Sequence, residues 1–344
     1  MPDIALDFPF ADPPAPGAVI EVAPGILWAR LPLPYRLNHV NVYFIEDGGA
    51  WAIVDTGIGD EDCRAAWEAL LAGPLAGARF SRLIVTHHHP DHIGLAGWLC
   101  DRLGVPLQTS LSSYLGCVNI SLSPGAMEAQ TYRDFYRSHG MSRDVADAVL
   151  TLGHGYLRMV TPLPASFRRL VQGDRLAMGG REFEVLTSEG HAQEQVMLHC
   201  RAANIFLPAD EVLARITPNV SVWAVDPDGD PLGLFLRSLA MIEREVAEDA
   251  LVLPGHHLPF RGLHKRTREL AEHHVERCAR IAAACAERPQ SVADLVPLLF
   301  PKVQDVHQLG FAFNEVHAHV NYMIYRGDLH QRSHNGIERV EAAG

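Results

Sequence analysis

A short cluster of histidines constrains this chain more than any other feature. Residues 86–92 read THHHPDH, so positions 87–92 hold four imidazoles and one carboxylate. The run at residues 82–85 before the cluster, apolar and β-branched after Arg82, predicts a buried strand, and residues 93–103 after it predict a helix. Loops between such elements are where α/β folds place their chemistry. Because imidazole and carboxylate are the usual ligands of zinc and similar divalent cations, the cluster predicts a metal site.

Further ligand-type residues lie far away along the chain. His191, Asp210 and His256 each come just past the C-terminal end of an apolar run that we predict to be a strand. A lone loop histidine is a weak signal of metal binding. Four strand ends in this order, beginning with the cluster at residues 87–92, are a much stronger one.

With these residues in place, the chain resembles the metallo-β-lactamase fold superfamily, whose hallmark is an HxHxDH loop followed by separate His, Asp and His ligands. Thr86, Gly94 and the Asp-Thr-Gly sequence at residues 55–57 also match, and the resemblance covers residues 18–260. It implies the α/β (α+β) class, with a four-layer αββα sandwich and two metals at one edge of its sheets. A glyoxalase-II-like branch of the superfamily shares this full ligand set.

The resemblance also implies a role for each ligand position. The first metal would be bound by His87, His89 and His191, the second by Asp91, His92 and His256, and Asp210 would bridge them. Ala209 and His257 stand where the family frequently has glycine. His257 leaves two imidazoles as alternatives for the last ligand, and the motif favours His256. We expect Asp55 to anchor the loop and His88 to point away from the metals.

The strand patterns fall into two blocks, residues 18–109 and 167–256, with a helical insertion at about 110–160. Two sheets packed face to face with helices outside would account for this arrangement. From residue 264 onward the strand signals stop, and three helices follow that resemble a winged-helix appendage. The predicted organisation is a flexible leader at 1–17, a catalytic domain at 18–260, a winged-helix-like helical domain at 261–335 and a frayed tail at 336–344.

The composition excludes several classes of protein. The net charge of −12 disfavours wholesale binding to nucleic acid or to an anionic membrane, and no apolar run is long enough to span a membrane. Residues 1–17 are acidic and rich in proline, unlike a secretion signal, so we expect a cytoplasmic protein. The six cysteines form no CxxC pair, which favours reduced, mostly buried thiols.

The expected set of imidazole and carboxylate ligands predicts a hydrolase that uses two divalent metal ions. Zinc is the default metal, and iron or manganese are alternatives. A hydroxide bridging the metals would attack a carbonyl, and Asp91 would orient it and carry its proton to the leaving group. A thioester or ester of the acyl-CoA or acyl-glutathione type is the first choice of substrate, and a lactone is the alternative. A secreted antibiotic-degrading β-lactamase is disfavoured by the N-terminal sequence.

A different class of function is an endoribonuclease or phosphodiesterase whose C-terminal domain contacts nucleic acid. Residues 261–344 hold 11 basic and 10 acidic side chains, so this part is nearly neutral. We therefore expect a small-molecule substrate and no nucleic-acid partner, with the C-terminal domain covering the site or forming a homodimer. The candidate substrate-binding residues are Arg215, Asn219, Tyr132 and Tyr136.

Overall fold

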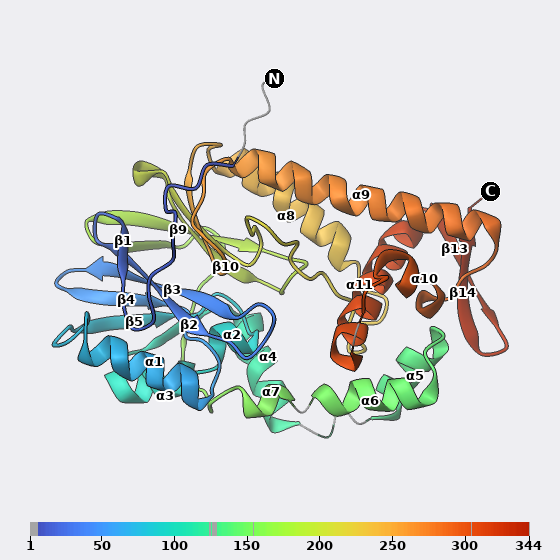
Figure 1. Cartoon of the computed structure of the whole chain (residues 1–344), viewed down its shortest axis with the longest axis horizontal. Coiled ribbons are helices and arrows are strands. Elements are labelled where there is room, and N and C mark those ends of the chain that lie inside the picture. The colour runs from blue at the N-terminus through green and yellow to red at the C-terminus, as the bar shows by residue number, and fades with distance from the viewer. Residues whose placement is uncertain (1–5, 124, 126–128, 154, 304, 344) are drawn as a thin grey trace. The chain divides into compact units, whose positions relative to one another are not determined.

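The computed structural model describes residues 6–123, 125, 129–153, 155–303 and 305–343 (Figure 1). These residues form two compact units, each built from three segments of the chain. The first unit comprises Met1–Leu122, Tyr156–Pro218 and Met241–Thr267, and the second comprises Ser123–Gly155, Asn219–Ala240 and Arg268–Gly344. This division differs from the single boundary expected near residue 260, because residues 123–155 of the helical insertion and residues 219–240 belong to the second unit.

The first sheet lies in the first unit and has the strand order β1-β2-β3-β4-β5-β6-β7. Neighbours are antiparallel from β1 to β4 and parallel from β4 to β7. Gly48 and Gly49, with φ of 62° and 81°, form the turn between β3 and β4, as the sequence predicts for a tight hairpin. The strands are β1 (Ile20–Ala23), β2 (Ile26–Pro32), β3 (His39–Asp47), β4 (Ala50–Val54), β5 (Phe80–Ile84), β6 (Leu107–Thr109) and β7 (Arg168–Arg169).

The second sheet also lies in the first unit and has the order β12-β11-β10-β9-β8. Its neighbours are antiparallel except for the parallel pair of β11 and β12. A short 3-10 helix (Arg201–Ala203) connects β10 to β11. The strands are β8 (Arg175–Met178), β9 (Arg181–Ser188), β10 (Gln195–Cys200), β11 (Ile205–Ala209) and β12 (Leu251–Pro254).

Two hydrophobic cores hold these layers together. One lies between the sheets, where Trp28 and Ile45 of the first sheet and Phe183 and Leu198 of the second belong to the same buried cluster. The other lies between the first sheet and the helices α1 (Glu61–Ala72) and α3 (Ala96–Leu103), which lie below that sheet in Figure 1. The predicted sandwich of two sheets with outer helices is therefore confirmed.

Helix α1 shows how closely local sequence sets these elements. Asp60 precedes it in an extended conformation, and its carboxylate accepts a hydrogen bond from the Cys63 amide. This N-cap satisfies a backbone donor that the first turn leaves free. On the inner face, the ring of Trp67 meets that of Phe44 edge-on, with centroids 5.7 Å apart. The buried side chains of α1 are Cys63, Trp67 and Leu70, whose spacing of three and four residues places them on one face of the helix.

Several helices complete the first unit or link it to the second. Helix α4 falls within the helical insertion expected at about 110–160, whereas α8 was not expected from the sequence. The short helix α2 follows the histidine cluster directly. The helices not yet given are α2 (Pro90–Ile93), α4 (Leu111–Leu122), α7 (Gly155–Arg158), α8 (Pro231–Glu245) and α9 (Leu263–Glu287).

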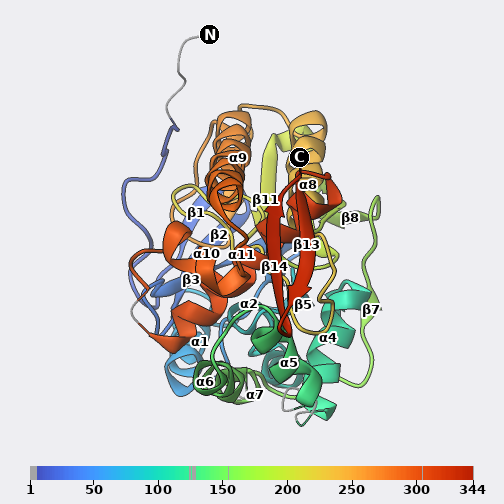
Figure 2. The same cartoon turned by 90° about the vertical axis from the view of Figure 1, so that its right-hand side faces the viewer.

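The second unit contains α5 (Gln130–Ser138), α6 (Arg143–Gly153), α10 (Val292–Leu299) and α11 (Val306–Tyr325). Its last element is a hairpin of β13 (Leu329–His334) and β14 (Ile337–Ala342), seen at the front of Figure 2. The expected frayed tail at 336–344 is therefore wrong for residues 337–342. The turn is Asn335-Gly336 with φ of 53° and 75°, a sequence that favours a tight hairpin.

The expected flexible leader has a backbone contact in its described part. The amide of Asp7 donates to the carbonyl of Arg261 at 3.2 Å, and the amide of Arg261 donates back at 2.8 Å. Residues 1–5 of the predicted leader lie outside the described residues. Among the described helices, none is long and apolar enough to cross a membrane. All six cysteines are free thiols, as predicted.

Two helical glycines of the first unit offer a matched test of this packing. A Cβ on Gly97 of α3 would lie 1.8 Å from the carbonyl oxygen of Pro162, whereas a Cβ on Gly116 of α4 would make ordinary contacts of 3.5 Å or more. We expect Gly97→Ala to lower the free energy of unfolding by about 1–3 kcal/mol, because backbone must move. Gly116→Ala should raise it by about 0.5–1 kcal/mol, since alanine favours helix. Denaturant titrations of both variants measure the difference, and equal stabilities would contradict the packing described.

Candidate metal centre

The candidate metal ligands all lie at C-terminal ends of strands in the first unit. The histidine cluster follows β5, His191 follows β9, Asp210 follows β11 and His256 follows β12. Because β11 and β12 are parallel neighbours, Asp210 and His256 emerge at the same sheet edge. The face-to-face packing of the two sheets brings the loop after β5 to the same edge as Asp210 and His256.

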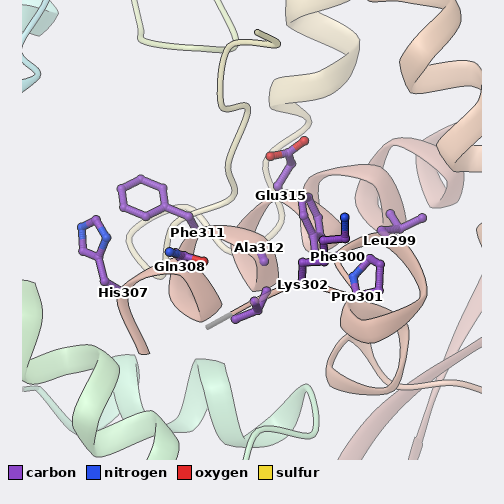
Figure 3. Close-up of a pocket in the computed structure, with 10 residues that line it drawn as sticks. Leu299, Phe300, Pro301, Lys302, His307, Gln308, Phe311, Ala312 and Glu315 are labelled. Carbon is purple, nitrogen blue, oxygen red and sulfur yellow. The ribbon is translucent and has the colours of Figure 1, made fainter. Parts of the chain in front are cut away.

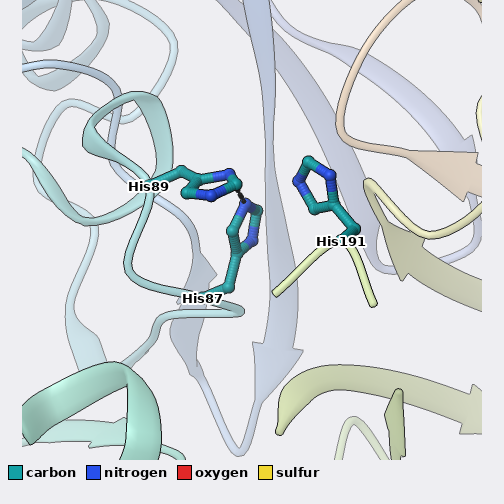
Figure 4. A group of neighbouring side chains, drawn as sticks. All are labelled: His87, His89 and His191. Carbon is teal, nitrogen blue, oxygen red and sulfur yellow. Dashed lines mark hydrogen bonds between the residues drawn. The ribbon is translucent and has the colours of Figure 1, made fainter. Parts of the chain in front are cut away.

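One group of donors consists of three imidazoles. Figure 4 shows His87, His89 and His191 turned toward one another, the first two from the β5 loop and the third from the β9–β10 loop. Nε2 of His87 lies 3.0 Å from Nδ1 of His89. One nitrogen from each of the three rings lies within 4.8 Å of the others. That spacing is compatible with three ligands of a single cation.

A second group combines Asp91, His92 and His256, whose donor atoms also lie within 4.8 Å of one another. Oδ2 of Asp91 is 3.7 Å from Nε2 of His92 and 3.4 Å from Nε2 of His256. Asp210 lies between the two groups. Its Oδ2 is 3.1 Å from Nε2 of His256 and 3.7 Å from Nε2 of His191. The structure thus brings all seven predicted ligand residues into one cluster.

Burial and charge together set the protonation of this cluster. Burial and the neighbouring imidazoles hold the pKa values of His87 and His89 well below the usual value. Burial also opposes the charge on His92 and His256, but the nearby carboxylates outweigh it. They raise the pKa of His92 well above its usual value and that of His256 to about 10. The carboxylates therefore draw positive charge into the cluster, as protons or as a metal cation.

Two observations show that these residues fit a divalent cation. Nε2 of His92 and Oδ1 of Asp210 are buried 3.4 Å apart, and neither has a well-formed hydrogen bond to any described residue. Buried polar atoms almost always have a partner, which a cation between them would supply. A Cβ at Gly255 would lie only 2.1 Å from Oδ1 of Asp210 and 2.9 Å from Cε1 of His92. Glycine at this position therefore keeps the donor cluster open.

Asp55 orients the donors of the β5 loop. Its carboxylate accepts hydrogen bonds from the amide of Thr86 at 2.8 Å and from the Thr86 hydroxyl at 2.9 Å. Nδ1 of His92 lies 2.8 Å from the same carboxylate, so its N–H donates there and Nε2 keeps its lone pair for a metal. The anchoring contacts expected of Asp55 are present. His88 lies outside the donor groups, and its ring instead packs beside Gly116.

The loop that carries His191 is tied to the start of α4. Glu194 has a left-handed φ of 48°, and its Oε2 accepts from the amide and the hydroxyl of Ser112 at 3.0 and 2.7 Å. Arg169 of β7 lies 3.1 Å from Oε1 of the same carboxylate. These contacts hold the pKa of Glu194 below its usual value, first through the Ser112 hydroxyl. Sequence reasoning did not single out Glu194.

The structure distinguishes between the two adjacent histidines after β12. Nε2 of His256 faces Asp91 and Asp210, whereas His257 belongs to no donor group among the described residues. Side chains of β2 and β3, which sequence reasoning missed, donate hydrogen bonds to the backbone around His257.

The sequence does mark one of these residues. Asn41 is a polar side chain inside the apolar run VNVYFI, and in the structure it is almost fully buried.

The four candidate substrate residues divide between the two units. Arg215 is exposed in the first unit, with its guanidinium 5.4 Å from the ring centre of Phe8. It is near enough to His257 to help lower the pKa of that imidazole, although burial is the main cause. In the second unit, the side-chain amide of Asn219 donates to Glu315 at 3.1 Å. Tyr132 lies on α5 of the same unit and is half-buried.

Tyr136 packs among aromatic side chains of the second unit. It is buried in the second unit, where its ring centre lies 5.0 Å from that of Phe135 and 5.4 Å from that of Phe313. These contacts are those of interior packing, and the substrate-binding role expected of Tyr136 stays a prediction. The second unit also has a pocket of about 480 Å³ beside Phe300, Phe311 and Glu315 (Figure 3). None of its lining residues belongs to the donor cluster.

Alanine substitutions of the adjacent histidines test which one is a ligand. We expect His256→Ala to reduce the amount of divalent metal that the purified protein retains, because a donor facing Asp210 is lost. His257→Ala should leave metal content near the wild-type value and serves as the matched control. Elemental analysis after dialysis measures both. Loss of metal in His257→Ala with retention in His256→Ala would reverse the assignment.

Comparisons with known proteins agree with this geometry. The family model of the metallo-beta-lactamase superfamily matches residues 35–273, and that of the metallo-beta-lactamase-like C-terminal domain matches residues 278–343. The probable metallo-hydrolase YqjP of Bacillus subtilis (strain 168) is 25% identical over 307 residues, which cover 87% of this chain and 92% of that protein.

Two solved structures resemble the whole chain. A beta-lactamase domain protein from Burkholderia ambifaria is 38% identical, with a TM-score of 0.91 and coverage of 98% of both chains. A metallo-beta-lactamase family protein from Thermus thermophilus is 27% identical, with a TM-score of 0.79 and coverage of 94% of this chain and 100% of the other. Together with the His/Asp donor cluster, these matches show that the chain belongs to the metallo-β-lactamase superfamily and is a metallo-hydrolase of that superfamily.

Proposed function

We propose that this protein is a dinuclear metal-dependent hydrolase that cleaves thioesters or esters of small molecules. The observation that carries the proposal is the position of Asp210 between two donor groups, with Asp91 at the accessible side of the cluster. The side chain of Asp91 is 22% exposed, whereas that of Asp210 is 9% exposed and those of His92 and His256 are almost completely buried.

The donor set supports two cations held close together. His87, His89 and His191 would hold one and Asp91, His92 and His256 the other, with Asp210 shared between the two groups. Neutral imidazoles and carboxylates suit zinc, and also iron or manganese. Divalent cations bound here would supply Lewis acidity that polarises a carbonyl and lowers the pKa of a water molecule toward neutrality.

The accessible carboxylate of Asp91 would carry the proton from the attacking water to the leaving group. When water adds its oxygen to the carbonyl carbon, Asp91 would accept the proton that is released. It would then return the proton to the sulfur or oxygen of the departing group as the acyl bond breaks. Water is consumed, and a carboxylic acid and a thiol or alcohol are formed. His92 and His256 hold Asp91 in place and keep its pKa at about 2, although burial opposes this.

Arg215 supports a substrate that carries a negative charge. It is exposed in the same unit as the donor cluster and forms no ion pair within the described part of the chain. A guanidinium in this position can pair with a carboxylate or phosphate on the thiol or alcohol portion of the substrate. The overall charge of −12 argues against a long polyanion such as RNA. A lactone is the second candidate, because the same attack opens a cyclic ester.

A substrate panel tests the reaction class. We expect acyl-CoA or acyl-glutathione to be hydrolysed faster than a lactone or bis-p-nitrophenyl phosphate. Asp91→Asn should lower kcat by about a hundredfold or more, because it removes the proton carrier and weakens a ligand position. Asp101→Asn, an exposed carboxylate on α3, is the control and should keep full activity. Turnover of the phosphodiester alone would overturn the proposal.

The role of Arg215 is tested with paired substrates. Arg215→Ala should lower kcat/KM for an anionic ester by about ten- to a hundredfold, the effect of losing one charge-assisted hydrogen bond. A neutral ester of the same acyl group should be affected much less. Arg64→Ala is a matched control, since Arg64 also lies over an aromatic ring, that of Trp98, on the helical side of the first unit. Equal losses for both esters would refute charge recognition by Arg215.

A further inference from the structure

The residue after the last metal ligand has an unusual backbone conformation. His257 has a φ of 67°, in the left-handed region that glycine adopts readily and that other residues adopt at an energetic penalty. A non-glycine residue stays in this conformation only when its surroundings hold it there. The direction in which His256 leaves the backbone depends on this turn, so the contacts that hold it matter for metal binding.

The carbonyl groups of this turn are bound by side chains of the first sheet. The carbonyl of His257 accepts from Asn41 at 2.9 Å and from Arg30 at 2.6 Å. The carbonyl of Pro254 accepts from Asn41 at 2.9 Å and from the Tyr43 hydroxyl at 2.8 Å. Nε of Arg30 in turn donates to Oδ1 of Asn41 at 3.1 Å. These contacts hold residues 254–257 against β2 and β3.

His39, at the start of β3, binds both adjacent histidines at once. Its carbonyl oxygen lies 2.7 Å from Nδ1 of His256, which donates to it. Its own Nε2 lies 2.9 Å from the backbone amide of His257 and accepts that hydrogen. The first contact places a hydrogen on Nδ1 of His256, so Nε2, which faces Asp91 and Asp210, is the nitrogen available to a cation. The second contact holds the left-handed turn.

The acceptor role defines the form of His39. Because Nε2 accepts from an amide, this imidazole is neutral and carries its hydrogen on Nδ1. Nδ1 lies 3.0 Å from Oδ1 of Asn38, which can accept that hydrogen. The register of β3 with β2, in which His39 pairs with Pro32, fixes where the imidazole emerges. A side chain without an acceptor at this position would leave the His257 amide without its partner.

We propose that the side chain of His39 is a positioning residue for the metal ligand His256, acting by holding the left-handed turn at His257. It does not bind the cation, because it is absent from every donor group among the described residues. The inference rests on the metal site of the proposed function and is independent of the substrate. It also explains how this chain tolerates histidine at a position whose conformation favours glycine.

Three variants separate this role from a general effect on folding. His39→Leu removes the acceptor and keeps an apolar side chain of similar bulk. His39→Gln retains an acceptor oxygen near the position of Nε2. The double variant His39→Leu/His257→Gly removes the acceptor but places glycine where the left-handed conformation needs no support.

The measurement is Co²⁺ and Zn²⁺ affinity of the metal-stripped full-length protein, by competition with a chromophoric chelator, with the Co²⁺ absorption spectrum as a second readout. Of the two cation sites, we expect His39→Leu to lower the affinity of the weaker one by about ten- to a hundredfold. This is the usual effect of losing a group that orients a metal ligand. His39→Gln should stay near the wild-type affinity. The double variant should regain about tenfold over His39→Leu.

The outcomes distinguish this inference from the proposed function. Unchanged metal affinity in His39→Leu would overturn the positioning role while leaving the dinuclear hydrolase intact. A loss in His39→Leu that glycine at position 257 does not recover would also overturn it, because the effect would then not pass through the turn. A wild-type protein that binds no divalent cation would overturn both. An unfolding midpoint of His39→Leu well above the assay temperature would show that its loss of affinity concerns the site rather than global folding.

Discussion

The buried carboxylate of Asp210 is the interaction on which the site depends. It attracts positive charge from three directions, with His92, His191 and His256 around its two oxygens. A carboxylate buried this deeply is unfavourable unless it is paired, because the protein interior solvates charge poorly. The imidazoles hold the pKa of Asp210 well below its usual value despite that burial. The arrangement is therefore stable only with protons or metal cations among these donors.

The supports of the site are distributed over both sheets. Asp55 and Thr86 orient the donors of the β5 loop, Glu194 ties down the loop of His191, and His39 and Asn41 bind the turn after His256. Asp55, Glu194 and His257 share a feature, since each is a non-glycine residue with a positive φ beside a ligand-bearing segment. Strained backbone of this kind is found where the surrounding contacts require a particular geometry.

The donor residues could be predicted from the sequence because their signal is local. A ligand-type residue directly after an apolar strand is visible within a few positions, and four such places in order identify the cluster. The supports could not be predicted in the same way. His39 and Asn41 contact residues more than 200 positions away, and those contacts depend on how two sheets pack. The hairpin of β13 and β14 was missed for another reason, since its strands bury only Leu329 and Val340 and show little alternation. For Tyr136 the sequence could not distinguish a substrate contact from interior packing, because an aromatic residue on a helix looks the same in sequence in both cases.

The order of the ligands along the chain has a consequence for biosynthesis. The first donor is His87 and the last is His256, so the cluster draws on most of the length of the first unit. Two segments of the second unit, residues 123–155 and 219–240, are synthesised before His256 leaves the ribosome. The nascent chain therefore holds an incomplete donor set for most of its synthesis. The group of His87, His89 and His191 has all its residues once position 191 is synthesised, whereas the group of Asp91, His92 and His256 is complete only after β12. A chain that stalls between these two points therefore carries one complete donor group and lacks a donor of the other.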